Sequence, residues 1–177
     1  MGVKGLSKNV IKPAWREGKL SDLPAGTRVG VDAMGWIHKA VVLNAEDIVK
    51  EKASSVSHHG VFVRCVQQLL HAKLRVVLVL DGRIWPLKKV ERSKRQNRRA
   101  QAREKAFEAE AARDPATATK LFKQAVPVPE AFISWVIQHC ADTDDVSICV
   151  ANYEADAQLA HLKVHSHVPP HVAMRTF

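Results

Sequence analysis

Three short apolar runs, each followed by acidic side chains, are the strongest constraint on how this chain can fold. The runs cover residues 28–32, 75–81 and 147–150 and are rich in valine, leucine and isoleucine. Short runs of this composition are typical of buried strands in a parallel sheet. Because helical patterns separate the runs, the sequence predicts an α/β fold with a doubly wound, mainly parallel sheet.

The acids that follow the runs predict a metal site. Asp32 and Asp81 end the first two runs, and Glu154 and Asp156 follow the third. Ligands bind at the carboxyl ends of parallel strands, where these four side chains would meet. Such crowding is costly unless a cation neutralises it, and Mg²⁺ prefers oxygen ligands. A simpler alternative stays open for Asp32 and Asp81, in which each only caps the turn or helix after its strand.

The positive charge of the chain is concentrated in one segment. The net charge is +9, and residues 83–105 contain ten Lys or Arg residues against two Glu residues. This concentration indicates a polyanionic partner, with nucleic acid favoured over membrane lipid. No run approaches the roughly 20 apolar residues of a membrane span, so a membrane partner is not expected. The N-terminus lacks a signal-peptide pattern, which favours a cytosolic or nuclear protein.

Residues 87–113 are predicted to form a long helix that projects into solvent or lies along a partner. They are good helix formers with few large apolar residues among them. Steps of three and four place five cations on one helical face, and the nearly single sign of the run excludes internal pairing as its explanation. We therefore expect phosphate contacts from Lys88, Arg92, Arg95, Arg99 and Arg103.

Further elements are predicted around this helix. Asp114 and Pro115 are an N-cap and a first helical residue, so a second helix should follow as far as about Ala125. Another helix should begin at Pro129-Glu130. Residues 46–58 are polar and are expected to form a mobile connection. Residues 163–177 contain no acid, and no strand is expected in them.

Together these features resemble the XPG/flap-endonuclease superfamily of structure-specific 5′ nucleases, and within it the exonuclease 1 branch. The resemblance is carried by residues 1–6, 31–39, 80–82, 86–89, 91–95 and 152–160, the last with the sequence NYEADAQLA. It implies a PIN-like 5′ nuclease core with a basic helical arch. The implied divisions are an XPG N-terminal nuclease region at 1–100 with the arch beginning near 87, the rest of the arch at 101–128, the start of the internal nuclease region at 129–162, and a divergent tail at 163–177.

The resemblance also implies roles for individual residues. Lys88 and Arg95 match arch residues that contact the scissile phosphate, and Arg92 is the alternative to Arg95 if the alignment shifts. His38 matches a position that stacks on the terminal base near the cut; from its residues alone, a lone helical histidine is more often a surface residue. Gly2 matches a glycine that lets the N-terminus lie beside the active site. The matched metal ligands, expected to hold two Mg²⁺ ions, are Asp32, Asp81, Glu154 and Asp156.

The implied activity is that of a Mg²⁺-dependent 5′→3′ DNA exonuclease or 5′ flap endonuclease. Such an enzyme would act on DNA with 5′ ends or flaps, in repair and recombination, in the nucleus. The family continues after residue 162 with further acids and a duplex-binding motif, and residues 163–177 do not match that continuation. A truncated chain is therefore expected, with an incomplete second metal site and an unpaired sheet edge.

Three alternatives remain open from the sequence. The first is a non-catalytic DNA-binding fragment of such a nuclease. The second is another Mg²⁺-dependent α/β enzyme, such as a phosphatase, although a small phosphorylated substrate needs no row of five cations. The third is a truncated product that barely folds.

Overall fold

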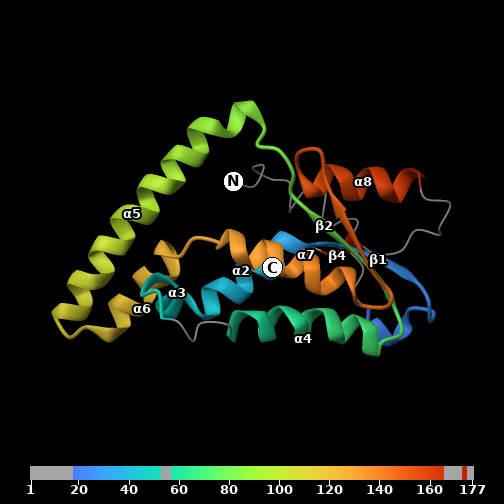
Figure 1. The fold of residues 1–177 in the computed structure, drawn as a ribbon, viewed down its shortest axis with the longest axis horizontal. Coiled ribbons are helices and arrows are strands. Elements are labelled where there is room, and N and C mark those ends of the chain that lie inside the picture. The colour runs from blue at the N-terminus through green and yellow to red at the C-terminus, as the bar shows by residue number, and fades with distance from the viewer. Residues whose placement is uncertain (1–17, 53–56, 166–172, 175–177) are drawn as a thin grey trace.

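A four-stranded parallel sheet lies at the centre of the molecule (Figure 1). The computed structural model describes residues 18–52, 57–165 and 173–174. The strand order is β3-β2-β1-β4, and all three pairings are parallel, as the apolar runs predict. The strands are β1 (Arg28–Asp32), β2 (Arg75–Leu80), β3 (Val146–Val150) and β4 (Ala173–Met174).

Helices cover both faces of the sheet, so the predicted doubly wound architecture is confirmed (Figure 1). On one face Val76 and Leu78 of β2 join the larger core with residues of α2, α4 and α7. On the other face Val77 and Val79 pack against Leu159 of α8. The alternation follows from the period of two along a strand. These helices are α2 (Ala33–Leu43), α4 (Ser57–His71), α7 (Glu130–Ala141) and α8 (Ala155–His165).

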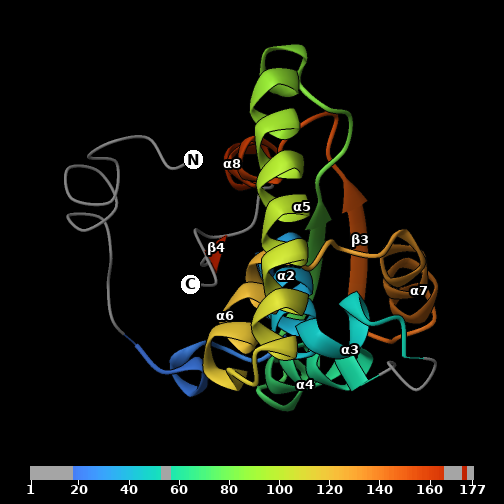
Figure 2. The same cartoon turned by 90° about the vertical axis from the view of Figure 1, so that its left-hand side faces the viewer.

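The long basic helix projects from the body of the protein, as predicted. A short 3-10 turn, η3 (Pro86–Lys88), leads into α5 (Lys89–Ala111), which forms a hairpin with α6 (Pro115–Ala125). In Figures 1 and 2 the green end of α5 lies away from the helices under the sheet, and its yellow end returns to them through α6. We call this hairpin, residues 86–125, the arch.

The arch hairpin is held by buried residues between its two helices and by the N-cap of α6. Ala102 and Ala106 are the buried residues of α5, and Phe122 is buried in α6. Asp114 caps α6 by accepting a hydrogen bond from the backbone N–H of Thr117 at 3.0 Å, as the Asp-Pro pair predicts. The arch therefore closes through contacts between its own helices, while most of the α5 surface stays in solvent.

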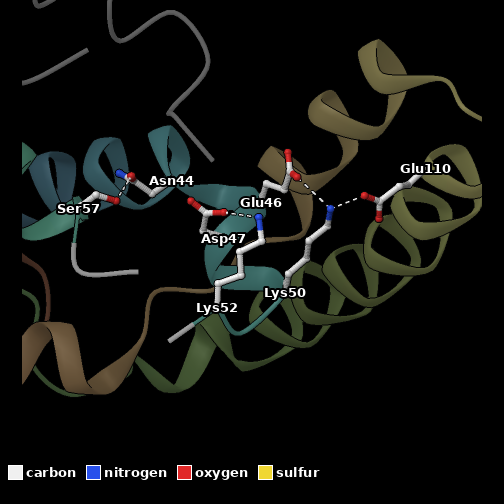
Figure 3. Close-up of polar contacts among 7 residues, drawn as sticks. All are labelled: Asn44, Glu46, Asp47, Lys50, Lys52, Ser57 and Glu110. Atoms are coloured by element: carbon white, nitrogen blue, oxygen red, sulfur yellow. Dashed lines mark hydrogen bonds and ion pairs between the residues drawn. The ribbon is translucent and has the colours of Figure 1, made fainter. Parts of the chain in front are cut away.

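The expectation of a mobile connection over residues 46–58 is wrong for much of that stretch. Residues Ala45–Val49 form a helix, α3, whose two end residues are buried in the core. Figure 3 shows this helix beside the arch, with Lys50 reaching Glu110 of α5. Polar residues dominate this stretch of the sequence, and a helix this short has too few apolar positions to reveal a period. Helix α4, from Ser57, takes up the last residues of the same stretch.

The expectation that residues 163–177 contain no strand is also wrong. Two of them, Ala173 and Met174, pair in parallel with Gly30 and Val31 of β1. The outer side of β1, which would otherwise be an unpaired edge, is covered over these residues. Two residues show no alternation, and the pairing is remote in sequence, so the sequence gives no local signal for it.

The part of the chain described by the structure contains no helix that is long and apolar enough to cross a membrane.

Candidate functional site

The site begins where backbone pairing between β2 and β3 continues past the ends of the strands. Beyond the ladder, the N–H of Gly82 donates to the carbonyl of Tyr153 at 2.8 Å, and the N–H of Arg83 donates to that of Asn152 at 3.0 Å. A Cβ atom on Gly82 would lie 1.7 Å from the carbonyl oxygen of Ala151. Glycine is therefore required there, and the close approach brings Asp81 beside the start of α8.

Two of the predicted acids cap helices. Asp32 Oδ1 accepts a hydrogen bond at 2.9 Å from the backbone N–H of Met34, so Asp32 is the N-cap of α2. Asp81 Oδ1 accepts one at 2.8 Å from the N–H of Ala155, the first residue of α8. Asp32 therefore does cap the helix after its strand, and its role as a metal ligand stays a prediction. Asp81 caps a helix 74 residues further along the chain, which sequence reasoning did not foresee.

Three acids share one electrostatic environment. Burial raises the pKa of Asp32, and the carboxylates of Asp81 and Asp156 raise that pKa further, while the backbone hydrogen bond from Met34 opposes the change. The carboxylates of separate strand ends thus lie close enough to repel one another, as their positions in the sequence predict. Capping alone does not relieve this repulsion.

Glu154 has a different partner. Its Oε2 accepts a hydrogen bond from Lys88 Nζ at 2.6 Å, which joins the loop after β3 to the base of the arch. In the described part of the chain, no group of three or more His, Cys, Asp or Glu side chains is placed to hold a metal ion. The donor chemistry and the raised pKa of Asp32 fit a hard cation. In the present arrangement, however, such a cation would compete with Lys88 for Glu154.

An open cavity of about 880 Å³ lies between this edge of the sheet and α5. Of the four acids predicted to bind metal, Asp81 and Glu154 line the cavity and Asp32 and Asp156 do not. The cations that were predicted to share a helical face all line it together, although Lys88 belongs to η3 and precedes α5. These residues are Lys88, Arg92, Arg95, Arg99 and Arg103.

The ion pairs of Arg95 and Arg103 are long. Arg95 Nε lies 3.6 Å from Glu91, and Arg103 lies 3.7 Å from Glu51, and both arginine side chains are about half exposed. Long, exposed pairs of this kind contribute little and are screened by salt. The cavity wall formed by α5 therefore remains strongly positive, opposite a wall that carries carboxylates.

His38 lines the same cavity from α2, whereas Trp36 does not. Desolvation lowers the pKa of His38, and Arg99 and Arg95 lower it further, while Asp81 acts in the opposite direction. The imidazole is therefore neutral at pH 7. Trp36 is buried in the core beside Phe62. The predicted role of Gly2 lies outside the described residues.

Residues 1–102 match the XPG N-terminal domain. The chain belongs to the XPG family. It is 30% identical over 168 residues to exonuclease 1 of Oryza sativa subsp. japonica, which covers 93% of this chain and 19% of that protein. It is also 30% identical over 175 residues to flap endonuclease 1 of Glycine max, covering 92% of this chain and 44% of that protein.

A solved structure of the catalytic core of Rad2 in complex with DNA substrate resembles this XPG-family chain over 91% of its length. The TM-score is 0.58 and the sequence identity is 26%, and the match covers 42% of the Rad2 chain. The resemblance stated from the sequence is therefore confirmed, together with the nuclease-like α/β fold. The chain spans less than half the length of each of these relatives.

Sequence reasoning about this XPG-family chain missed an aromatic pair at the site. Trp85 and Tyr153 both line the cavity, and their rings meet edge to face with centroids 4.6 Å apart. Trp85 is four residues after Asp81, and Tyr153 directly precedes Glu154. Their closeness in sequence to Asp81 and Glu154, two predicted metal ligands, was the signal that could have identified them.

Proposed function

We propose that this chain forms part of a Mg²⁺-dependent 5′ nuclease, which removes nucleotides from 5′ ends of DNA or cleaves 5′ flaps. The observation that carries the proposal is the cavity, because one of its walls holds Asp81 and Glu154 and another holds five cations. A DNA strand in this cavity would place its phosphates between the two. We further propose that it acts in the nucleus, in DNA repair and recombination, as its membership of the XPG family suggests.

The arch residues would hold the DNA backbone. Cations at successive turns of α5 match a chain of phosphates, and contacts of this kind release counterions and make affinity depend steeply on salt. Lys88 and Arg95 would orient the phosphate to be cleaved and balance the charge that develops on it. His38, neutral at pH 7, suits stacking on a base better than contact with a phosphate.

The four acids would hold the metal. Bound Mg²⁺ would supply an activated water and stabilise the leaving oxygen. The carboxylates of Asp81 and Asp156 already repel that of Asp32, and a bound cation would relieve this repulsion. Glu154 would join them after Lys88 leaves it, so phosphate binding by Lys88 and metal binding by Glu154 support each other.

A second candidate function is DNA binding without cleavage. It is favoured by the ion pair between Lys88 and Glu154, and by the lack of a ready group of three metal-binding side chains in the described residues. In this case Asp32 and Asp81 would serve only as helix caps, and Glu154 only as the partner of Lys88. The cations would still give salt-sensitive affinity for DNA.

The test uses 5′-labelled duplex and flap DNA with the purified protein and Mg²⁺. The proposal expects short 5′-labelled products that are lost in Asp32→Ala and Asp81→Ala. Asp144→Ala, which removes an exposed acid outside the cavity, should cleave like the wild type. Salt-sensitive binding without any cleavage would support the second candidate. Weak binding that does not change with salt would contradict both.

A further inference from the structure

The aromatic pair of the cavity has no role in holding the core. Trp85 is 42% exposed and Tyr153 is 38% exposed, and neither belongs to a cluster of buried residues. Nearby, Leu87 is 84% exposed and Val90 is 67% exposed. Large aromatic side chains usually dominate cores or interfaces, so two of them in contact in an open cavity that also holds cations need another explanation.

Backbone hydrogen bonds hold both aromatic residues next to the charged groups of the site. The N–H of Lys88 donates to the carbonyl of Trp85 at 2.9 Å, within the η3 turn. The carbonyl of Tyr153 accepts from the N–H of Gly82, and its neighbour Glu154 binds Lys88. The rings also support each other edge to face. The backbones of both residues are thus held at the site before any ligand arrives, which limits the conformational entropy lost on binding.

We propose that Trp85 and Tyr153 form a stacking platform for an unpaired base beside the phosphate held by Lys88. The inference rests on the proposed function and assigns to that site the recognition of a single-stranded nucleotide. Every base has an aromatic face, so stacking on such rings tolerates any sequence. The platform comes from the loops after β2 and β3, and is therefore separate from His38 on α2.

Charge selects nucleic acid as the occupant of this platform. Arg83, Lys88 and Arg92 line the same cavity as the two rings. A strand that stacks a base on the pair can place its phosphates against these cations. An apolar segment of a partner protein would cover the rings but would leave the cations without anions, which makes it the less complementary occupant.

The experiment measures binding of DNA with a short 5′ single-stranded overhang, without divalent metal, by fluorescence anisotropy. Two DNAs are compared, one with normal bases and one with abasic residues in the overhang. We expect the wild type to bind the abasic DNA about tenfold more weakly, within the range for loss of one base–aromatic stack. This comparison needs no variant, so it does not depend on the folding of a variant.

Variants then locate the effect. Trp85→Ala and Tyr153→Ala should bind normal DNA about tenfold more weakly than the wild type and abasic DNA equally well. Trp85→Phe should recover most of the loss. Leu43→Ala, which removes an exposed apolar side chain outside the cavity, should match the wild type on both DNAs.

Three results would contradict the proposal that Trp85 and Tyr153 stack on a base. In the first, the wild type binds both DNAs equally. In the second, Trp85→Ala weakens both DNAs by the same factor, which indicates a structural role. In the third, Trp85→Ala has no effect, as expected if the rings serve a protein partner. A wild type whose DNA affinity does not respond to salt would overturn the proposed function as well, and this separates the two failures.

Discussion

The acidic edge of the sheet and the basic face of the arch meet at one cavity, but they are constructed in different ways. Asp81 follows three buried residues of β2 and is hydrogen-bonded to the first residue of α8. The arch cations lie along one exposed helix with only Ala102 and Ala106 buried. The acids depend on contacts between distant segments, whereas the cations depend on the local period of a helix.

This difference predicts two kinds of response to mutation. A change that disturbs the pairing of residues 80–83 with residues 151–153 should displace several carboxylates at once. A change at one cation of α5 should remove one contact and leave its neighbours in place, because sites that share no partners are nearly additive. Mutations should therefore abolish function abruptly at the acidic edge and reduce it step by step along the arch.

The largest effect is expected for Gly82→Ala. Its new Cβ would lie 1.7 Å from the carbonyl oxygen of Ala151, so the two backbones must separate, at a cost of about 3 kcal/mol in the free energy of unfolding. Cleavage of 5′-labelled DNA should be lost as well. Gly60→Ala is the control, because a Cβ there meets nothing within 4 Å, and it should stabilise α4 by about 0.5–1 kcal/mol. Urea unfolding measures both. Equal stabilities of the two variants would contradict this account of Gly82.

A graded effect is expected along the arch. The double variant Arg92→Ala/Arg99→Ala should reduce the slope of log affinity against log salt by about 2, close to one unit per phosphate contact. Lys120→Ala/Lys123→Ala removes the same charge from exposed positions of α6 that do not line the cavity, and should change the slope far less. Equal changes in both variants would mean that net charge, and not the cavity wall, determines DNA affinity.

The same contrast explains what the sequence could predict. The row of cations and the Asp114-Pro115 helix start depend on residues close in the chain, and both predictions are confirmed. The apolar runs identified β1, β2 and β3 for the same reason. The β4 pairing and the Lys88–Glu154 ion pair join residues far apart in sequence, so no local period indicated them. The short helix α3 was missed because five residues are too few to show a helical pattern.

A smaller effect, on the melting temperature, is expected from the repulsion among the acids at the sheet edge. The folded chain raises the pKa of Asp32, so it binds this proton more tightly than the unfolded chain does. Stability therefore falls as pH rises from about 3.8 through the raised pKa, and the loss persists at neutral pH. Asn cannot ionise and caps a helix as well as Asp. Asp32→Asn should thus melt a few degrees higher than the wild type at pH 7.5, and the difference should vanish at acidic pH.

A second cap provides the control for this prediction. Hydrogen bonds from Thr117 lower the pKa of Asp114, so its ionised form stabilises the folded chain at neutral pH. Asp114→Asn should therefore not raise the melting temperature. Mg²⁺ should narrow the gap between wild type and Asp32→Asn, because a bound cation relieves the repulsion only where the carboxylate remains. A lower melting temperature for Asp32→Asn at pH 7.5 would contradict the repulsion.

The smallest effect is expected where the arch rests on the body of the protein. Lys50, at the end of α3, donates hydrogen bonds to Glu46 and to Glu110 of α5 (Figure 3). Its Nζ also lies 5.0 Å from the ring centre of Phe122 in α6. Because this one side chain contacts both arch helices, Lys50→Met should speed amide hydrogen exchange at the ends of α5 and α6 near Glu110 and Phe122, and leave β2 unchanged. Lys52→Met, which removes only the pair with Asp47, should leave exchange in the arch as it is. Faster exchange in β2 would show that the arch and the sheet unfold together, and would remove the distinction between the two regions.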